Sequence, residues 1–166
     1  VIAADAMNDI ALLKVDAPSP KPLKFPKSNN IRQGEACAAY GFPYSELLSS
    51  QGNLATGIVS AVSGLGNDTR YVQITCPVQA GNSGSPLADS KGGVIGVVTS
   101  KISDMKILKT KGELPQNINF ALKSSTVKAF LETHNVEYLQ MQTTQQLETT
   151  VLATLLREST VHIFAK

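Results

Sequence analysis

A glycine-rich loop with a serine at its centre, enclosed by two strand-like runs, constrains this chain more than any other feature. The loop reads QAGNSGSPL over residues 79–87, after the run YVQIT at 71–75 and before GGVIGVV at 92–98. Glycine at position 81 permits a left-handed backbone, and such a bend turns the Gly81 and Ser83 amides into one concavity. Two donors beside a serine hydroxyl can hold the oxyanion that forms after nucleophilic attack. The pattern therefore predicts a serine nucleophile, with an ordinary polar turn as the alternative.

The residues after the serine favour an all-β setting for this loop. The nucleophile elbow of α/β-hydrolases requires Gly-x-Ser-x-Gly followed by a helix. Here Ser85 occupies the last glycine position, and a strand-like run follows it. Elsewhere in the chain, short alternating runs are separated by glycine and proline, which is typical of a β-barrel.

The alternation also predicts which side chains share one face of a strand. Val72 and Ile74 are expected on one face of their strand, and Tyr71, Gln73 and Thr75 on the other. This separation follows because successive side chains of a strand point to opposite faces of the sheet.

The sequence also predicts one hairpin turn and one helix. Residues 90–93 are expected to form a hairpin turn that feeds a strand at 94–98. Ser125 is expected to cap a helix that ends at His134. The inner face of that helix is predicted to carry Val127, Phe130 and Leu131.

Five segments, taken in order, resemble the trypsin-like serine proteases, and within them the HtrA/DegP-like branch. They read VIAAD with NDIALLKV at 1–15, GEACAAYGFP at 34–43, TGIVSAV at 56–62, PVQAGNSGSPL with GGVIGVV at 77–98, and INFAL at 118–122. The specificity of the resemblance rests on the order of the motifs more than on any one of them.

The resemblance implies an all-β, chymotrypsin-like double β-barrel with a short C-terminal helix and a helical tail. Residues 1–30 are expected to end the first barrel, which is partial here, and to carry the triad aspartate. Residues 31–134 are expected to form the complete second barrel, with the nucleophile serine and the closing helix. Residues 135–166 are expected to form a helical tail plus a strand.

The residues of a serine protease site follow from the same resemblance. It implies Asp9 and Ser83 as catalytic residues and an oxyanion hole at Gly81, Ser83 and Asn82. The substrate pocket that it implies is lined by Pro77, Ala80, Val98, Thr99, Ser100 and Asn119. It implies neither a metal nor a cofactor.

The triad histidine has no counterpart at its usual place in the chain order. In this fold the histidine precedes the aspartate and the serine, yet no histidine precedes Asp9. The two histidines, His134 and His162, are expected to be surface or packing residues. We expect the triad histidine upstream of residue 1, so that this segment is N-terminally truncated and inactive by itself. A catalytically inactive, protease-like peptide-binding domain is the alternative function.

Two substitutions relative to digestive trypsins shape the expected specificity and activation. Pro77 stands where those enzymes carry the aspartate that binds a basic side chain, so we expect cleavage after small or medium apolar residues. Asn82 replaces the aspartate that pairs with a newly cut N-terminus. Activation by loop ordering or oligomerisation is therefore expected in place of propeptide cleavage.

Composition narrows the choice of partners. The net charge is +2, and lysine and arginine form no cluster dense enough to predict nucleic-acid binding. No apolar stretch approaches the length of a membrane span. We expect a polypeptide substrate, and the chain is compatible with forming a homo-oligomer. The resemblance favours a periplasmic or secreted location.

The two cysteines and the C-terminal residues each support a structural prediction. Cys37 and Cys76 are expected to be buried free thiols, with a disulfide as the alternative in an oxidising compartment. In the tail, Leu147, Val151, Leu152, Leu155 and Leu156 recur at helical spacing and predict a packing stripe. Val161, Ile163 and Ala165 then alternate as a strand would.

Overall fold

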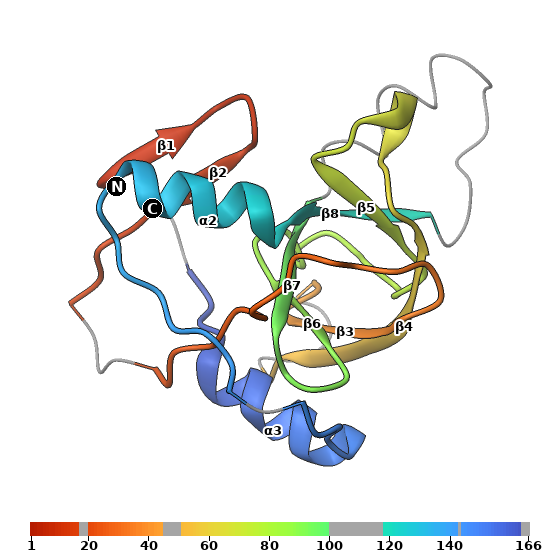
Figure 1. The fold of residues 1–166 in the computed structure, drawn as a ribbon. Coiled ribbons are helices and arrows are strands. Elements are labelled where there is room, and N and C mark those ends of the chain that lie inside the picture. The colour runs from red at the N-terminus through yellow and green to blue at the C-terminus, as the bar shows by residue number, and fades with distance from the viewer. Residues whose placement is uncertain (17–19, 45–50, 100–117, 143, 164–166) are drawn as a thin grey trace.

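The computed structural model describes residues 1–16, 20–44, 51–99, 118–142 and 144–163 of the chain. Its centre is a closed barrel of antiparallel strands in the order β3-β4-β5-β8-β7-β6, with β6 pairing back onto β3 (Figure 1). The strands are β3 (Ala36–Gly41), β4 (Asn53–Ala61), β5 (Tyr71–Ile74), β6 (Pro86–Asp89), β7 (Val94–Thr99) and β8 (Asn119–Lys123). The expected all-β barrel is confirmed.

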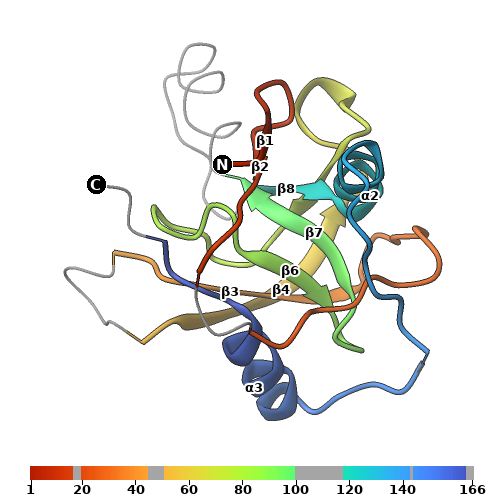
Figure 2. The same ribbon diagram turned by 90° about the vertical axis from the view of Figure 1, so that its left-hand side faces the viewer.

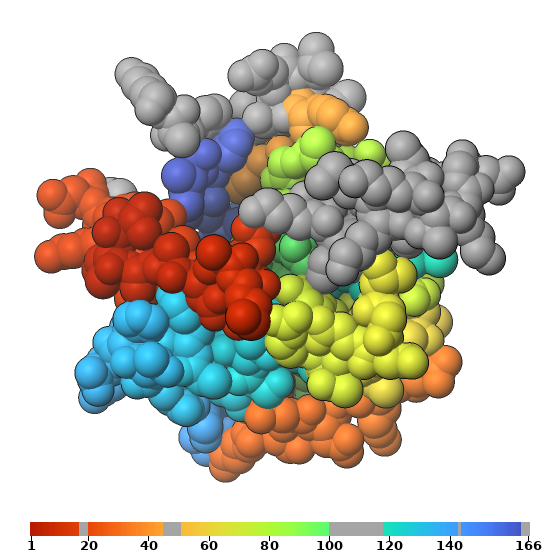
Figure 3. Space-filling model, turned by 90° about the horizontal axis from the view of Figure 1, so that it is seen from above, coloured from red at the N-terminus to blue at the C-terminus, as the bar shows by residue number. Residues whose placement is uncertain are grey.

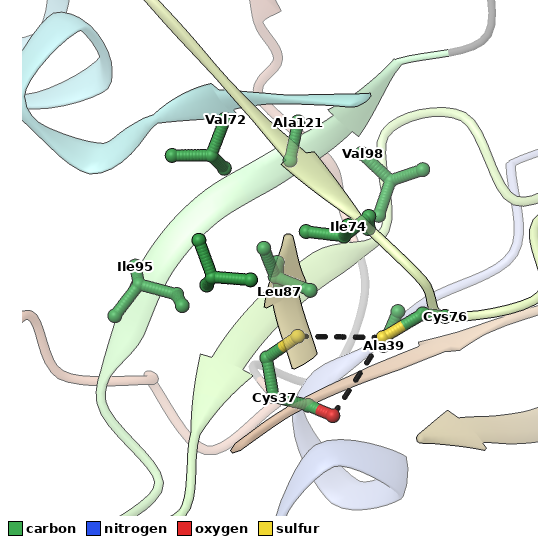
Figure 4. Close-up of a cluster of buried hydrophobic side chains, with 10 residues drawn as sticks. Cys37, Ala39, Val72, Ile74, Cys76, Leu87, Ile95, Val98 and Ala121 are labelled. Carbon is green, nitrogen blue, oxygen red and sulfur yellow. Dashed lines mark hydrogen bonds between the residues drawn. The ribbon is translucent and has the colours of Figure 1, made fainter. Parts of the chain in front are cut away.

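The barrel interior is filled by small and branched apolar side chains. Val72 and Ile74 are both 0% exposed and belong to this core, so they share one face of β5 as their alternation predicts (Figure 4). Tyr71, expected on the opposite face, is also buried, at 5% exposure. Its outer face is covered because the Arg70 guanidinium lies 5.5 Å above the Tyr71 ring.

A small separate sheet precedes the barrel. Strands β1 (Ala3–Asp5) and β2 (Ile10–Leu12) pair antiparallel and form a sheet of their own. Seen from above, this red hairpin lies against the cyan helix α2 (Ser124–Thr133) on one side and the yellow-green segment around β5 on the other (Figure 3). The Arg70 Nη1 atom donates a 2.9 Å hydrogen bond to the Asn8 Oδ1 atom, which ties the hairpin to the barrel.

Helix α2 closes one side of the barrel but begins differently from the expectation. Its N-cap is Lys123, without a side-chain capping bond, whereas Ser125 lies inside the helix. The helix follows β8 without a connecting loop, so the cap position falls on the last residue of the strand. The expectation that Ser125 caps the helix is therefore wrong. His134 is the C-cap, one residue beyond the last helical residue.

The tail forms helix α3 (Thr149–Ser159), which lies below β3 and the barrel (Figure 2). Leu152 and Leu156 are buried in it, whereas Val151 is 52% exposed, so the predicted stripe is wrong at that residue. Residues 161–163 form no strand, and Ala165 lies outside the described residues. Among the described residues, no helix is both long and apolar enough to cross a bilayer.

Candidate active site

The loop around Ser83 is attached to the barrel through β7. The Gly84 amide donates to the Val98 carbonyl at 2.9 Å, and the Val98 amide donates to the Ser85 carbonyl at 2.9 Å. Within the loop, the Asn82 amide donates to the Gln79 carbonyl and the Ser85 amide to the Asn82 carbonyl, both at 3.0 Å. We call residues 79–85 the serine loop. These bonds hold it in two successive tight turns that are tied to the end of β7.

Two glycines in the left-handed region flank the serine. Gly81 has φ +98° and Gly84 has φ +84°, conformations that side chains rarely adopt. The Ser83 side chain lies exposed between them. The serine loop therefore bends twice and presents the hydroxyl-bearing residue outward.

The chain after β3 forms the floor of the serine loop. The Phe42 carbonyl oxygen occupies the place that a Cβ atom on Gly81 would need, and the Pro43 Cα lies 3.3 Å from the same point. The Tyr44 amide donates a 3.1 Å hydrogen bond to the Ala80 carbonyl. Only glycine at position 81 allows the two backbone segments to lie this close.

Asn82 and Ser85 turn inward where Ser83 turns outward. Their exposed fractions are 5% and 4%. Both side chains lie against Gly41, because a Cβ built there would clash with the Ser85 Oγ and would lie 2.7 Å from the Asn82 Oδ1. The Asn82 Oδ1 is buried and has no hydrogen-bond partner in the described part of the chain. The backbone amide of Asn82 donates its hydrogen bond to the Gln79 carbonyl. The resemblance, by contrast, implies that Asn82 takes part in the oxyanion hole.

Several of the residues expected at the substrate pocket lie near the end of β7 and the start of β8, which pair with each other. The Asn119 Nδ2 donates a 2.8 Å hydrogen bond to the Cys76 carbonyl, next to Pro77. Pro77 and Ala80 are exposed, whereas the Val98 side chain is 1% exposed and packs in the barrel core. Thr99 is 8% exposed and pairs with Phe120, beside Asn119. Ser100 lies outside the described residues.

Asp9 lies at the surface on the β1–β2 hairpin, which is separate from the barrel sheet. It ends the turn between β1 and β2, has φ +55° and is exposed. The turn is held by Asp5, whose Oδ1 accepts the amide of Met7 at 2.9 Å and that of Asn8 at 3.1 Å. The Asn8 side chain and amide lower the pKa of the Asp5 carboxyl. Asn8, next to Asp9, accepts a hydrogen bond from the Arg70 side chain, next to Tyr71, so Asp9 lies near the Tyr71 end of β5. Burial raises the pKa of Tyr71.

The two histidines occupy different surroundings. The His134 Nδ1 lies 2.8 Å from the Phe130 carbonyl at the end of α2, and the residue is exposed. The His162 ring stacks on Phe42 with centroids 4.7 Å apart and planes 6° apart. One histidine therefore touches the floor of the serine loop. Nothing in the sequence predicts this contact, because no repeat or spacing relates the tail to the residues after β3.

Cys37 and Cys76 meet in the barrel core. Both are buried free thiols, as expected, with their Sγ atoms 3.5 Å apart (Figure 4). The hydrogen bond with Cys76 and burial raise the pKa of the Cys37 thiol. Cys37 is therefore neutral at physiological pH. Cys76 immediately precedes Pro77, at the start of the segment that leads to the serine loop.

The chain matches a protein family and is similar to known proteins. A family model described as a trypsin-like peptidase domain matches residues 1–97. The chain is 44% identical over 153 residues to uncharacterized protein y4bJ of Sinorhizobium fredii, covering 92% of this chain and 24% of that protein. It is 36% identical over 140 residues to serine protease HTRA1B of Danio rerio, covering 79% of this chain and 26% of that protein. These relatives are therefore much longer than the segment they share with this chain.

A solved structure shares the fold. The crystal structure of the serine endoprotease from Yersinia pestis superposes with a TM-score of 0.62 at 25% sequence identity. The superposition covers 80% of this chain and 42% of that one.

Proposed function

Because this chain belongs to the trypsin-like peptidase domain family, in its HtrA-like branch, we propose that it supplies the nucleophile and the aspartate of a serine endopeptidase. The family expected from the order of the motifs is confirmed by the family match and by the similarity to HtrA proteases. The catalytic roles that we assign to individual residues are part of this proposal.

The proposed reaction is acyl transfer from a peptide to water. Ser83 attacks the peptide carbonyl while a histidine from a segment upstream of Val1 takes the hydroxyl proton. Asp9 holds that histidine in the required tautomer, and the Gly81 and Ser83 amides bind the oxyanion. The histidine then protonates the leaving amine, and water releases the acyl group from Ser83.

The observation that carries this proposal is the conformation of the serine loop. Ser83 is exposed between two left-handed glycines, while Asn82 and Ser85 on either side of it are buried. An ordinary surface turn needs neither the second glycine bend nor the close approach of Gly81 to Phe42. Such a constrained presentation of one hydroxyl supports its use as a nucleophile.

The surroundings of Pro77 support a preference for residues without positive charge. Pro77 is exposed at the start of the segment that leads to the serine loop, and Asn119 holds the carbonyl just before it. Neither side chain offers a carboxylate to a lysine or arginine of the substrate. We propose cleavage after small or medium apolar residues.

The test uses the form of the protein that includes the segment upstream of Val1. Hydrolysis of an unfolded polypeptide is measured for the wild type, Ser83→Ala and the matched control Ser85→Ala. Ser83→Ala is expected to lower kcat by about a thousandfold or more, while Ser85→Ala retains most of the activity. Equal activity of Ser83→Ala and the wild type would overturn the proposal. Peptide binding without any cleavage by the wild type would instead favour the inactive, peptide-binding alternative.

A further inference from the structure

The C-terminal segment is packed into the barrel domain and is not an appendage of it. Leu152 and Leu156 of α3 are 5% and 0% exposed and form a second buried cluster with Ala38, Tyr40 and Ala88. The Leu147 amide donates a 2.9 Å hydrogen bond to the Ser90 carbonyl. This segment lies beyond the residues that the family model matches, which end at residue 97.

Beyond α3 the chain runs to the floor of the serine loop. The Thr160 hydroxyl donates a 2.8 Å hydrogen bond to the Leu156 carbonyl at the end of the helix. Two residues later, the His162 ring stacks on Phe42 almost in parallel. Phe42 also meets the edge of the Tyr40 ring, with centroids 6.2 Å apart. Phe42 is thus held by one aromatic residue of the barrel and by one of the tail.

The backbone of Phe42 is the part that touches the serine loop. Its carbonyl oxygen lies against Gly81, and Tyr44, two residues further, holds the Ala80 carbonyl at 3.1 Å. A displacement of Phe42 would therefore be transmitted to the Gly81 amide, which is a proposed oxyanion donor. Small displacements of such donors are costly, because their orientation toward the oxyanion must be preorganised.

We propose that His162 is a positioning residue for the serine loop, acting through its stack on Phe42, so that the C-terminal segment is part of the peptidase unit. This inference rests on the proposed function for its kinetic consequence, but its structural consequence is independent. The neighbours Val161 and Ile163 are 51% and 56% exposed, so truncating Val161 provides a control that leaves the His162 stack in place.

The experiment compares His162→Ala, His162→Phe and the matched control Val161→Ala in the form that includes the upstream segment. Amide hydrogen exchange of residues 80–83 and the kinetics of peptide hydrolysis are measured well below the melting temperature of every variant. His162→Ala is expected to speed exchange in the serine loop and to lower kcat, with KM unchanged, each by about threefold to tenfold, the range for losing one aromatic stack. His162→Phe is expected to restore both, and Val161→Ala to change neither.

The inference is overturned if His162→Ala lowers only the melting temperature, with exchange in the serine loop and kcat unchanged. Failure of His162→Phe to restore the exchange rates also overturns it. If the wild type hydrolyses nothing while exchange responds as expected, the proposed function fails and the positioning of the serine loop by His162 stands.

Discussion

The carbonyl oxygen of Phe42 occupies the space beside Gly81 in which any other residue would place its Cβ atom. The two residues come from segments about forty positions apart in sequence, yet their backbones are in direct contact. The residues that follow β3 and the serine loop are therefore packed tightly against each other. A substitution that displaces the backbone of either segment should therefore also displace the backbone of the other.

The first prediction tests this close approach with two alanine substitutions. Gly81→Ala combines an unfavourable φ with a clash against Phe42, whereas Gly84→Ala has a similar φ and no atom within 4 Å of its Cβ. Gly84→Ala is expected to cost about 1–2 kcal/mol of unfolding free energy from backbone strain alone. Gly81→Ala should cost more and lower kcat by about a hundredfold or more, because an oxyanion donor moves.

Denaturant unfolding and peptide hydrolysis measure both effects. Equal losses of stability and activity in the two variants would show that Phe42 exerts no steric constraint on Gly81.

The second prediction concerns the contact between Gly41 and Ser85. A methyl group at position 41 would overlap the Ser85 hydroxyl and crowd the Asn82 amide oxygen, which lies 2.7 Å from the Cβ position. Gly41→Ala is expected to destabilise the fold by about 1–3 kcal/mol, the usual cost of overpacking. Combining it with Ser85→Gly removes the worse overlap, so a double-mutant cycle should show coupling of at least about 0.5 kcal/mol. Additive effects of the two changes would contradict the packing described here.

The third prediction uses the buried oxygen of Asn82. Asn82→Leu removes an acceptor that has no partner in the described part of the chain, so its unfolding free energy should stay within about 1 kcal/mol of the wild type. Asn82→Asp places a carboxylate at the same site and should cost about 3 kcal/mol or more at pH 7.

The effect of pH on Asn82→Asp has a definite sign. Burial raises the pKa of the folded-state carboxyl above its unfolded value of about 3.9, so the penalty grows as the pH rises from there. Unfolding measured between pH 4 and pH 7 checks this. A variant as stable as the wild type at pH 7 would mean that a cation or donor meets this side chain.

The fourth prediction addresses the thiol pair in the barrel core. Cys37 and Cys76 are 4% and 0% exposed, so neither sulfur atom is accessible to a reagent in the native fold. Both should resist an aromatic disulfide reagent in the native protein at pH 8 and react fully in denaturant. Fast labelling of either thiol in the native state would show that this end of the core opens readily.

The main features of the barrel were predictable because each depends on neighbouring residues. The alternation around β5 predicts that Val72 and Ile74 share one face, and Gly81 predicts a bend in the serine loop. Tyr71 escaped the same rule because the Arg70 side chain and the β1–β2 hairpin cover the outer side of that strand. Alternation predicts which side chains lie on the same face of a strand, but it does not predict which other segments cover that face.

The errors in the tail and at α2 have a similar origin. Ser125 has the chemistry of a cap, but the helix begins at Ser124 because β8 leads into it directly. Val161 and Ile163 alternate like a strand, yet residues 161–163 run beside Phe42 without strand pairing. The stack of His162 on Phe42 joins residues far apart in sequence, and no local pattern encodes such a contact.

The most direct test of the account is the reaction of a fluorophosphonate probe with the form of the protein that includes the segment upstream of Val1. The adduct is located by peptide mass spectrometry in the wild type, Ser85→Ala and Asp9→Asn. We predict a single adduct on Ser83 in the wild type and in Ser85→Ala, formed about ten thousandfold more slowly in Asp9→Asn. Labelling of a different serine, or labelling of Ser83 at the same rate with and without the Asp9 carboxylate, would contradict it.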